Sequence, residues 1–401
     1  MVSSSDSITS LYVHVPFCAK KCSYCAFYSE ASDGEVVNRY ISALIREMEW
    51  VAGNLRPRTV FFGGGTPSLL NVKQWERVLG AMDRLGLLGA GEWTVECNPA
   101  TVSLEKAALL KSAGVNRISM GVQSLNESLL DRLGRVHSRQ MVFKSFDILR
   151  RAGFTNLNLD LMFGIPGQTL EIWRDTLVEV FSLGSEHLSC YEVIYEEDTP
   201  LYEQLRAGEF EVDEDLVCAM YEELVQRAAQ AGFEQYEVAN FARVCRRTEA
   251  KSSQEAHVPK PSEPQVPIQA CRHNINYWRG GSFYGLGPSA TSYVHGVRTK
   301  NYSNTRLYCD RIETGQRPVE SREELPSLAR AGETAAFGLR MTAGWPFEQF
   351  RQVTGHDLRQ GWAGEMEQLT GQGWGERKPD RFQLTPRGLR FADAAAQLFL
   401  R

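Results

Sequence analysis

Positive charge is missing from the start of the chain, and long apolar runs are missing throughout. The first ten residues, MVSSSDSITS, contain no Lys or Arg and no apolar stretch, so neither a secretory signal nor an organellar transit peptide is expected there. No later segment is long and apolar enough to cross a bilayer. We therefore expect a soluble, cytoplasmic protein with no transmembrane segment, for which a peripheral membrane contact stays open.

An excess of basic residues is also absent. The 401 residues include 44 Lys and Arg against 49 Asp and Glu, which gives a formal net charge of −5. No nucleic-acid partner is expected from this balance. With 43% hydrophobic and 23% charged residues, the composition is that of a globular protein. The length predicts one large domain and one or two smaller ones, and it leaves the oligomeric state open between monomer and dimer.

Cysteine occurs in an odd number, nine, in a chain without an expected signal peptide. A disulfide framework is therefore not expected, and clustered cysteines favour metal ligation or redox chemistry. Three cysteines form a C-x3-C-x2-C pattern at Cys18, Cys22 and Cys25. The others are scattered, and most of them are expected to be small apolar core residues: Cys97, Cys190, Cys218, Cys245, Cys271 and Cys309.

Short apolar or β-branched runs alternate with amphipathic stretches in the first half of the chain. Strands are expected at 11–15, 59–62, 93–96, 117–120, 157–161 and 187–194. Helices are expected at 35–52, 71–86, 103–113, 139–152 and 170–183. This alternation predicts an α/β fold, a parallel sheet with right-handed crossovers that forms a partial (β/α)6 TIM-type barrel.

The pattern changes after residue 200. A helix is expected at 213–231 and a strand-like piece at 234–240, whereas 246–268 is rich in Pro, Ser, Glu and Lys and predicts a disordered insertion. The C-terminal segment predicts several helices, a strand pair around RFQL and a last helix opened by Thr385 and Pro386, which resembles a winged-helix module. We expect a core at 1–200, an extension at 201–320 and a C-terminal helical domain at 321–401.

The cysteine triad follows the first predicted strand. Thiolates are the usual ligands of iron–sulfur clusters, and three of them would leave one iron of a [4Fe–4S] cluster without a protein ligand. Zinc would need a fourth ligand, and His14, the nearest candidate, lies inside the strand. We interpret Cys18, Cys22 and Cys25 as cluster ligands, with S-adenosylmethionine bound at the open iron. Reduction of that sulfonium would give a 5′-deoxyadenosyl radical.

Other unusual residues fall at the ends of the predicted strands. Gly63, Gly64 and Gly65 follow the second strand, and glycine lets the backbone approach a ligand closely. Glu96 closes the third strand, GVQS follows the fourth, and Asp160 lies near the end of the fifth. Because the carboxyl ends of parallel strands form the binding edge of such sheets, these residues are expected to share one site with the triad.

These motifs occur in the order of a known family. The chain resembles the oxygen-independent coproporphyrinogen III oxidase (HemN-like) superfamily of radical SAM proteins, and within it the HemW-type heme chaperones. The resemblance extends over most of the chain and rests on LYVHVPFCAKKCSYCAFYS, FFGGGTPS, ECNP, RISMGVQS, LGRVHS, NLDLMFGIPGQT and HNINYW.

The resemblance implies roles for individual residues. Tyr12 and Tyr24 would contact the cofactor near the cluster, and Glu96 would accept hydrogen bonds from its polar groups. Gln123 and Arg135 would hold its polar end, with Arg135 suited to a forked grip on the carboxylate.

The glycine turn and one strand end complete the implied cofactor site. Gly64, Gly65 and Thr66 would line S-adenosylmethionine, and Asp160 would accept hydrogen bonds from the ribose. A flavodoxin- or ferredoxin-type protein is expected as the electron donor.

Two functions remain open. The oxidase carries a fourth cysteine two positions after the third, where this chain has Phe27, a substitution similar to the HemW pattern. We therefore favour a heme chaperone that delivers heme to acceptor hemoproteins. The alternative is an oxygen-independent coproporphyrinogen III oxidase of porphyrin biosynthesis, and another radical reaction on a tetrapyrrole is a third hypothesis.

The segment HNINYW is the expected heme contact. Imidazole is a common axial ligand, and aromatic rings can cover a porphyrin face, so the resemblance implies heme contacts at His273, Tyr277 and Trp278. Cys271 is an alternative ligand, and a histidine satisfied inside a buried loop is the alternative without heme. His137 is a further candidate for a polar contact.

Overall fold

The computed structural model describes residues 7–31, 33–244 and 266–401. The chain divides into two compact units. Unit 1 contains the residues up to 223 and 282–324, and unit 2 contains 224–281 and 325–401. The predicted disordered insertion, apart from its last three residues, lies outside the described residues.

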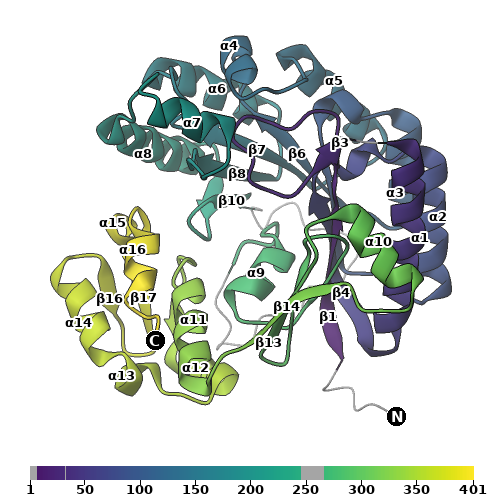
Figure 1. The fold of residues 1–401 in the computed structure, drawn as a ribbon. Helices are drawn as coiled ribbons and strands as arrows, with labels where there is room; N and C mark the ends of the chain where they lie inside the picture. Colours follow the sequence, from purple (N-terminus) through teal and green to yellow (C-terminus); the bar gives the residue numbers. More distant parts are fainter. Residues whose placement is uncertain (1–6, 32, 245–265) are drawn as a thin grey trace, which may run out of the picture. The chain divides into compact units, whose positions relative to one another are not determined.

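A parallel sheet forms the centre of unit 1 (Figure 1). Its strands lie in the order β11–β1–β4–β5–β6–β7–β8. Their bounds are β1 Ile8–Val15, β4 Leu55–Gly64, β5 Glu92–Cys97, β6 Arg117–Gln123, β7 Leu157–Phe163, β8 His187–Glu192 and β11 Tyr284–Leu286. The six predicted strands are confirmed. β11, which comes from far along the chain, adds a seventh parallel strand beside β1.

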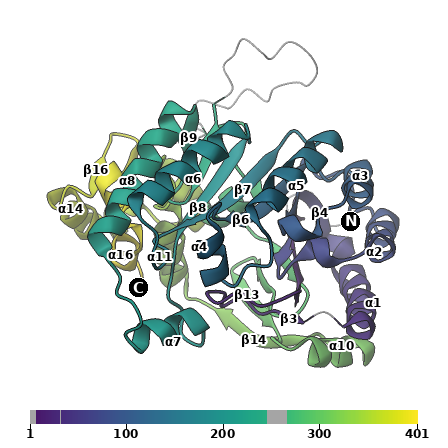
Figure 2. The same cartoon turned by 90° about the horizontal axis from the view of Figure 1, so that it is seen from above.

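Helices α1, α2, α3, α5 and α6 form an arc outside these strands (Figures 1 and 2). The helices of this region are α1 Gly34–Val51, α2 Val72–Arg84, α3 Leu104–Ser112, α4 Glu127–Arg132, α5 Arg139–Arg151, α6 Leu170–Ser182, α7 Pro200–Arg206 and α8 Glu214–Gln230, of which α8 continues into unit 2 after residue 223. Most begin at an Asp, Asn, Ser or Thr whose side chain caps a backbone N–H, as at Asn71, which forms a capping box with Gln74. The predicted helices are confirmed.

A smaller layer of unit 1 follows β11. It contains β12 Thr291–Val294, β13 Val297–Asn301, α10 Thr305–Glu313 and β14 Val319–Glu324, and the three strands pair antiparallel. The buried carboxylate of Glu47 on α1 anchors this layer. It accepts hydrogen bonds from Gly287 N (2.8 Å), Asn301 Nδ2 (2.8 Å) and the Tyr308 hydroxyl (2.6 Å).

Unit 2 contains a short antiparallel pair, β9 Phe233–Gln235 and β10 Asn240–Arg243, and the helix α9 Arg272–Trp278. The strand predicted at 234–240 is not continuous: it covers the end of β9, a turn and the first residue of β10. The two strands are separated because Glu237 turns inward, where its carboxylate accepts hydrogen bonds from the Ala239 N–H and the Asn240 side chain.

The C-terminal part of unit 2 is mostly helical, as predicted. It contains α11 Ser327–Gly338, β15 Trp345–Pro346, α12 Phe347–Thr354, α13 Leu358–Gly361, α14 Ala363–Gly371, β16 Gly375–Arg377, β17 Arg381–Leu384, α15 Pro386–Leu389 and α16 Ala392–Gln397. The predicted strand pair is β16–β17, and β15 adds a third strand. The core packs around Trp345, Phe350, Trp362 and Phe382.

Candidate functional site

The three cysteines of the triad lie in a loop at the carboxyl end of β1. Cys18 belongs to β2 (Phe17–Cys18), which pairs in parallel with β3 (Glu30–Ala31) and closes the base of the loop. All three thiols are half-buried. Burial raises the pKa of the Cys25 thiol, and the nearby Cys22 and Cys18 raise it further. The three thiols therefore lie near enough to influence one another's ionisation.

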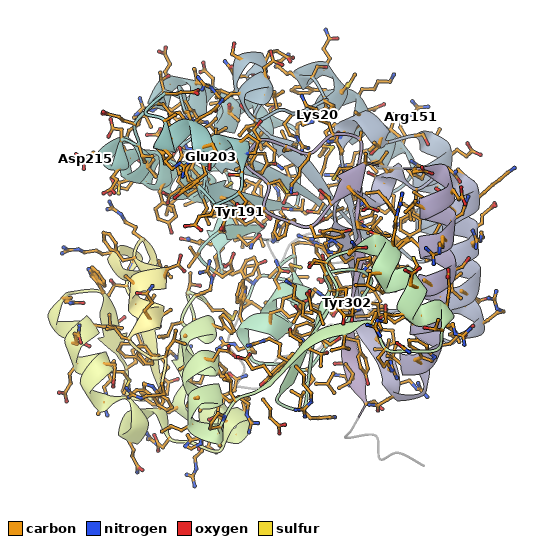
Figure 3. The ribbon with its side chains drawn as sticks, in the orientation of Figure 1. Lys20, Arg151, Tyr191, Glu203, Asp215 and Tyr302 are labelled. Atoms are coloured by element: carbon orange, nitrogen blue, oxygen red, sulfur yellow. The ribbon has the colours of Figure 1, made fainter. Side chains whose placement is uncertain are left out.

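Main-chain hydrogen bonds hold the middle of the cysteine loop on both sides. The N–H of Ser23 donates to Leu133 O at 3.0 Å, and its carbonyl accepts from Leu201 N, at the start of α7, at 2.9 Å. Figure 3 labels Lys20 in the loop and Glu203 in α7, the two segments that the second bond joins. Gly134, with φ +69°, permits the close approach, since an added Cβ would lie 3.0 Å from Ser23 Oγ. The loop is therefore positioned by the protein itself.

Arg135 reaches the loop from the segment after α4. Its Nη1 donates to Cys22 Sγ at 3.5 Å and its Nη2 to Gly121 O at 2.7 Å. Its Nε is buried and receives no acceptor from the described part of the chain. The Nε–H group is therefore free to donate to a ligand such as the carboxylate that the resemblance implies.

The glycine turn at the end of β4 packs directly against the cysteine loop. Gly64 has φ +104°, and an added Cβ would lie 2.5 Å from the His14 ring. A Cβ on Gly65 would lie 2.7 Å from Phe17 O. Thr66 N donates to Phe17 O at 2.7 Å, and its hydroxyl lies 3.6 Å from Cys18 Sγ. The turn therefore packs on the first part of the cysteine loop.

The backbone amides of the turn bind protein acceptors. Gly64 N donates to Glu96 Oε2 at 3.2 Å, and Gly65 N donates to Val15 O at 2.8 Å. Glycine is required here mainly by the close packing of strands β1 and β4 beside the buried His14 ring. That ring has its Nδ1 3.0 Å from the Tyr12 hydroxyl and its Nε2 2.9 Å from Tyr28 O. His14 is thus a packed strand residue, as predicted.

Two carboxylates lie towards the carboxyl ends of their strands. Glu96 is the next-to-last residue of β5, and Asp160 lies inside β7, which ends at Phe163. Burial raises the pKa of Glu96 to about 8, the charge of Asp160 adds to this, and the bond from Gly64 N opposes it. Burial also raises the pKa of Asp160, which accepts hydrogen bonds from Ser119 Oγ (3.0 Å) and Asn158 Nδ2 (2.7 Å). Acceptors held this far from water suit the hydroxyl and ammonium groups of a polar ligand.

Tyr24 lies in the cysteine loop, and Gln123 is the last residue of β6. Tyr24 packs beside an apolar cluster that includes Leu129 and Leu133, and burial raises its pKa. Gln123 ends β6 with φ +64°, an uncommon backbone for glutamine. Such conformations concentrate at functional sites.

Sequence reasoning missed the residues that orient the site. Asn158 bridges Asp160 and His187, whose Nδ1 lies 2.6 Å from Asn158 Oδ1. The available signal was a buried strand carrying Asn and Asp in alternate positions. Ser23, in contrast, acts through its backbone and gives no signal in the sequence.

The HNINYW segment forms α9 of unit 2. His273 is 1% exposed, and its Nε2 lies 2.7 Å from the Tyr277 hydroxyl one turn later. Trp278 packs near Phe337, and the Arg340 guanidinium lies 5.1 Å from its ring. In this conformation an iron would reach His273 Nε2 only after the Tyr277 hydroxyl moved.

Two other candidate residues are buried. Cys271 caps α9 and its N–H donates to the Tyr236 hydroxyl at 3.1 Å. His137 Nε2 lies 3.0 Å from Val122 O, and burial, with the nearby charge of Arg135, lowers its pKa to about 4. His137 is therefore neutral at physiological pH.

Within the described residues, no three His, Cys, Asp or Glu side chains are placed to hold a single metal ion, and no helix found there is long and apolar enough to cross a membrane.

Comparisons with known proteins agree with the geometry. The Radical SAM superfamily model matches residues 12–180, and the HemN C-terminal domain model matches 325–391. Heme chaperone HemW of Bacillus subtilis is 34% identical over 87% of this chain and 88% of the relative. HemW of Lactococcus lactis is 32% identical over 98% and 97%, and that of Escherichia coli 31% over 98% of each.

The fold also matches a solved structure. The radical SAM coproporphyrinogen III oxidase HemN of Escherichia coli superposes with a TM-score of 0.79 over 99% of this chain and 91% of that chain. At 20% identity this likeness concerns the fold alone. Together with the matched domains and the relatives that align along most of the sequence, it shows that the chain belongs to the HemW family of radical SAM proteins.

Proposed function

We propose that the protein is a heme chaperone that binds heme and passes it to acceptor hemoproteins, and that it carries a [4Fe–4S] cluster and S-adenosylmethionine. The observation that carries this proposal is the alignment of relatives named heme chaperone HemW along nearly the whole chain. We expect a flavodoxin- or ferredoxin-type protein as the electron donor.

Cys18, Cys22 and Cys25 would hold the cluster, each through one thiolate, with one iron left for S-adenosylmethionine. When bound, the pair supplies reductive cleavage of a carbon–sulfur bond. The two backbone hydrogen bonds of Ser23, here called the Ser23 clamp, would position the loop before the cluster binds. Arg135 donates a hydrogen bond to Cys22 Sγ. Donors to a ligand sulfur stabilise the more negative, reduced state of a cluster.

Glu96 and Asp160 would bind the nucleotide from the sheet edge. Because burial raises the pKa of both carboxyl groups, a ligand that donates hydrogen bonds or carries an ammonium group would stabilise their ionised forms. The bonds from Ser119 and Asn158 orient Asp160. Gly64 and Gly65 leave no Cβ between the turn and the loop.

Phe27 favours the chaperone over the alternative, an oxygen-independent coproporphyrinogen III oxidase. Its side chain is 69% exposed, and it occupies the position of the additional cysteine of that oxidase. An aromatic ring cannot replace a thiol as an iron ligand or redox group. The similarity to HemN extends to the fold, which serves many functions.

A parallel experiment on one anaerobically reconstituted sample tests the proposal. We expect a Soret band on heme titration, transfer of the heme to an apo-hemoprotein, and no protoporphyrinogen from coproporphyrinogen with reductant and S-adenosylmethionine. Turnover of coproporphyrinogen would instead establish the oxidase. Cys22→Ser should reduce bound iron, whereas Cys218→Ser, at a half-buried thiol of α8, is the matched control and should retain it.

His273→Ala tests the implied axial ligand separately. We propose that His273 contacts the heme iron once the Tyr277 hydroxyl has moved. The variant should then shift or weaken the Soret band, and Tyr277→Phe, which removes the competing hydroxyl, should leave it intact or strengthen it. An unchanged spectrum in the His273 variant would remove this residue from the proposal.

A further inference from the structure

Arg279 directly follows the HNINYW segment, and its guanidinium is held in place within unit 2. Nη1 donates to Gly344 O at 2.7 Å, and the guanidinium carbon lies 4.7 Å from the Trp345 ring. The hydrogen bond fixes one corner of the group, and the ring supports its plane. The remaining donors therefore point in a fixed direction.

The remaining donors have no acceptor within the part of the chain that the structure describes. Nε and Nη2 of Arg279 are buried, and none of the described residues accepts a hydrogen bond from either. These two nitrogens form the edge of a guanidinium that a carboxylate binds through two parallel hydrogen bonds. Buried N–H groups of a cation that lack an acceptor are costly, which makes this edge unusual in a folded protein.

The surroundings of Arg279 are cationic. Burial lowers its pKa to about 10, and the positive charge of Arg381 lowers it further, so the group stays charged at neutral pH while a like charge lies nearby. The preceding residue adds a donor, because Trp278 Nε1 is also buried with no partner in the described ranges. Phe337, near Trp278, leaves 41% of its surface exposed.

We propose that the Nε–Nη2 edge of Arg279 binds a carboxylate, and that this carboxylate is a propionate of heme. The inference rests on the proposed heme function and deepens it by naming a residue that recognises the periphery of the porphyrin. A propionate supplies the acceptor that the fork lacks, and the macrocycle supplies an apolar face for the neighbouring aromatic rings. Because protein atoms cover both nitrogens, neighbouring side chains move when the propionate enters.

A comparison of two ligands, heme with free propionates and heme with both propionates esterified, separates recognition of the carboxylate from general packing. For the intact, cluster-loaded protein we expect Arg279→Gln to weaken binding of free heme about tenfold or more, the range for a charge-assisted hydrogen-bonded pair. Binding of the dimethyl ester should be unchanged. Arg279→Lys retains the charge but loses the fork. It should therefore bind free heme more tightly than Arg279→Gln and more weakly than the parent protein.

Arg359→Gln is the matched control. Arg359 also lies over an aromatic ring of unit 2, but its fork is filled by Asp357, so the variant should bind both hemes as the parent does. Since an unpaired buried cation is removed, Arg279→Gln should retain or raise the melting temperature, and this excludes misfolding as the cause of a loss. If Arg279→Gln binds free heme as tightly as the parent does, or loses as much affinity for the ester as for free heme, the inference about Arg279 is wrong, while the proposed heme function stands. A parent protein that binds neither heme overturns the heme function and the inference with it.

Discussion

Gly64→Ala tests whether close packing of the glycine turn on β1 holds the site together. The backbone at Gly64 has φ +104°, and a Cβ there would lie 2.5 Å from two atoms of the His14 ring. That ring cannot move easily, because both of its nitrogens have partners, the Tyr12 hydroxyl and Tyr28 O. The added methyl group therefore meets two penalties at once.

The magnitudes of the two penalties can be separated. An L-residue with a positive φ costs roughly 1–3 kcal/mol, and overpacking a buried site costs about 1–3 kcal/mol more. We expect the local free energy of opening in unit 1 to fall by about 2–6 kcal/mol. Gly114 has nearly the same backbone, φ +103°, with nothing within 4 Å of an added Cβ, so Gly114→Ala should show the backbone penalty only.

Hydrogen–deuterium exchange of peptides from β1 and β4, with and without added S-adenosylmethionine, measures both effects. We expect faster exchange and weaker ligand protection in Gly64→Ala than in Gly114→Ala. Adding His14→Ala removes the ring and should recover the difference between the two glycine variants. Equal effects of the two alanine substitutions would refute the packing argument.

Three further predictions concern charge and iron. Burial raises the pKa of Glu47 from 4.5 to about 7. Because this carboxyl group loses its proton at lower pH in the unfolded chain than in the folded protein, the free energy of unfolding should fall by roughly 3 kcal/mol as the pH rises from about 4.5 to about 7. Urea unfolding over this range should show the slope reduced in Glu47→Gln and kept in Glu49→Gln, an exposed control on the same helix; an unaltered slope would contradict the assignment. Arg135→Leu removes the hydrogen bond to Cys22 Sγ and should lower the cluster potential in an EPR-monitored redox titration; a potential that stays the same would show that the bond is absent in the loaded protein. Chelation of iron should leave the Ser23 amide protected from exchange, because its carbonyl partner is protein backbone; loss of that protection would show that iron, and not the clamp, positions the loop.

The sheet could be predicted because its strands and helices carry clear periodic patterns. The edge location of the triad, the glycine turn, Glu96 and Asp160 followed from the rule that parallel strands share a carboxyl edge. β11 could not be predicted, because three residues, YGL, are too few for a periodic signal. Its place beside β1 depends on contacts distant in sequence.

The contacts inside the site depended on tertiary structure. Nothing in the sequence indicates that the amides of Gly64 and Gly65 bind Glu96 and Val15, or that the backbone of Ser23 is held on both sides. His273 and Tyr277 are one helical turn apart. Their contact could be predicted from this spacing only once α9 was known to be a helix.

EPR spectroscopy of the reduced, anaerobically reconstituted protein, recorded with and without S-adenosylmethionine, tests the central claim most directly. Three thiolate ligands and one open iron predict a [4Fe–4S] signal whose shape changes when the nucleotide is added. A sample that contains zinc, or a cluster signal that the nucleotide leaves unaltered, would contradict the account.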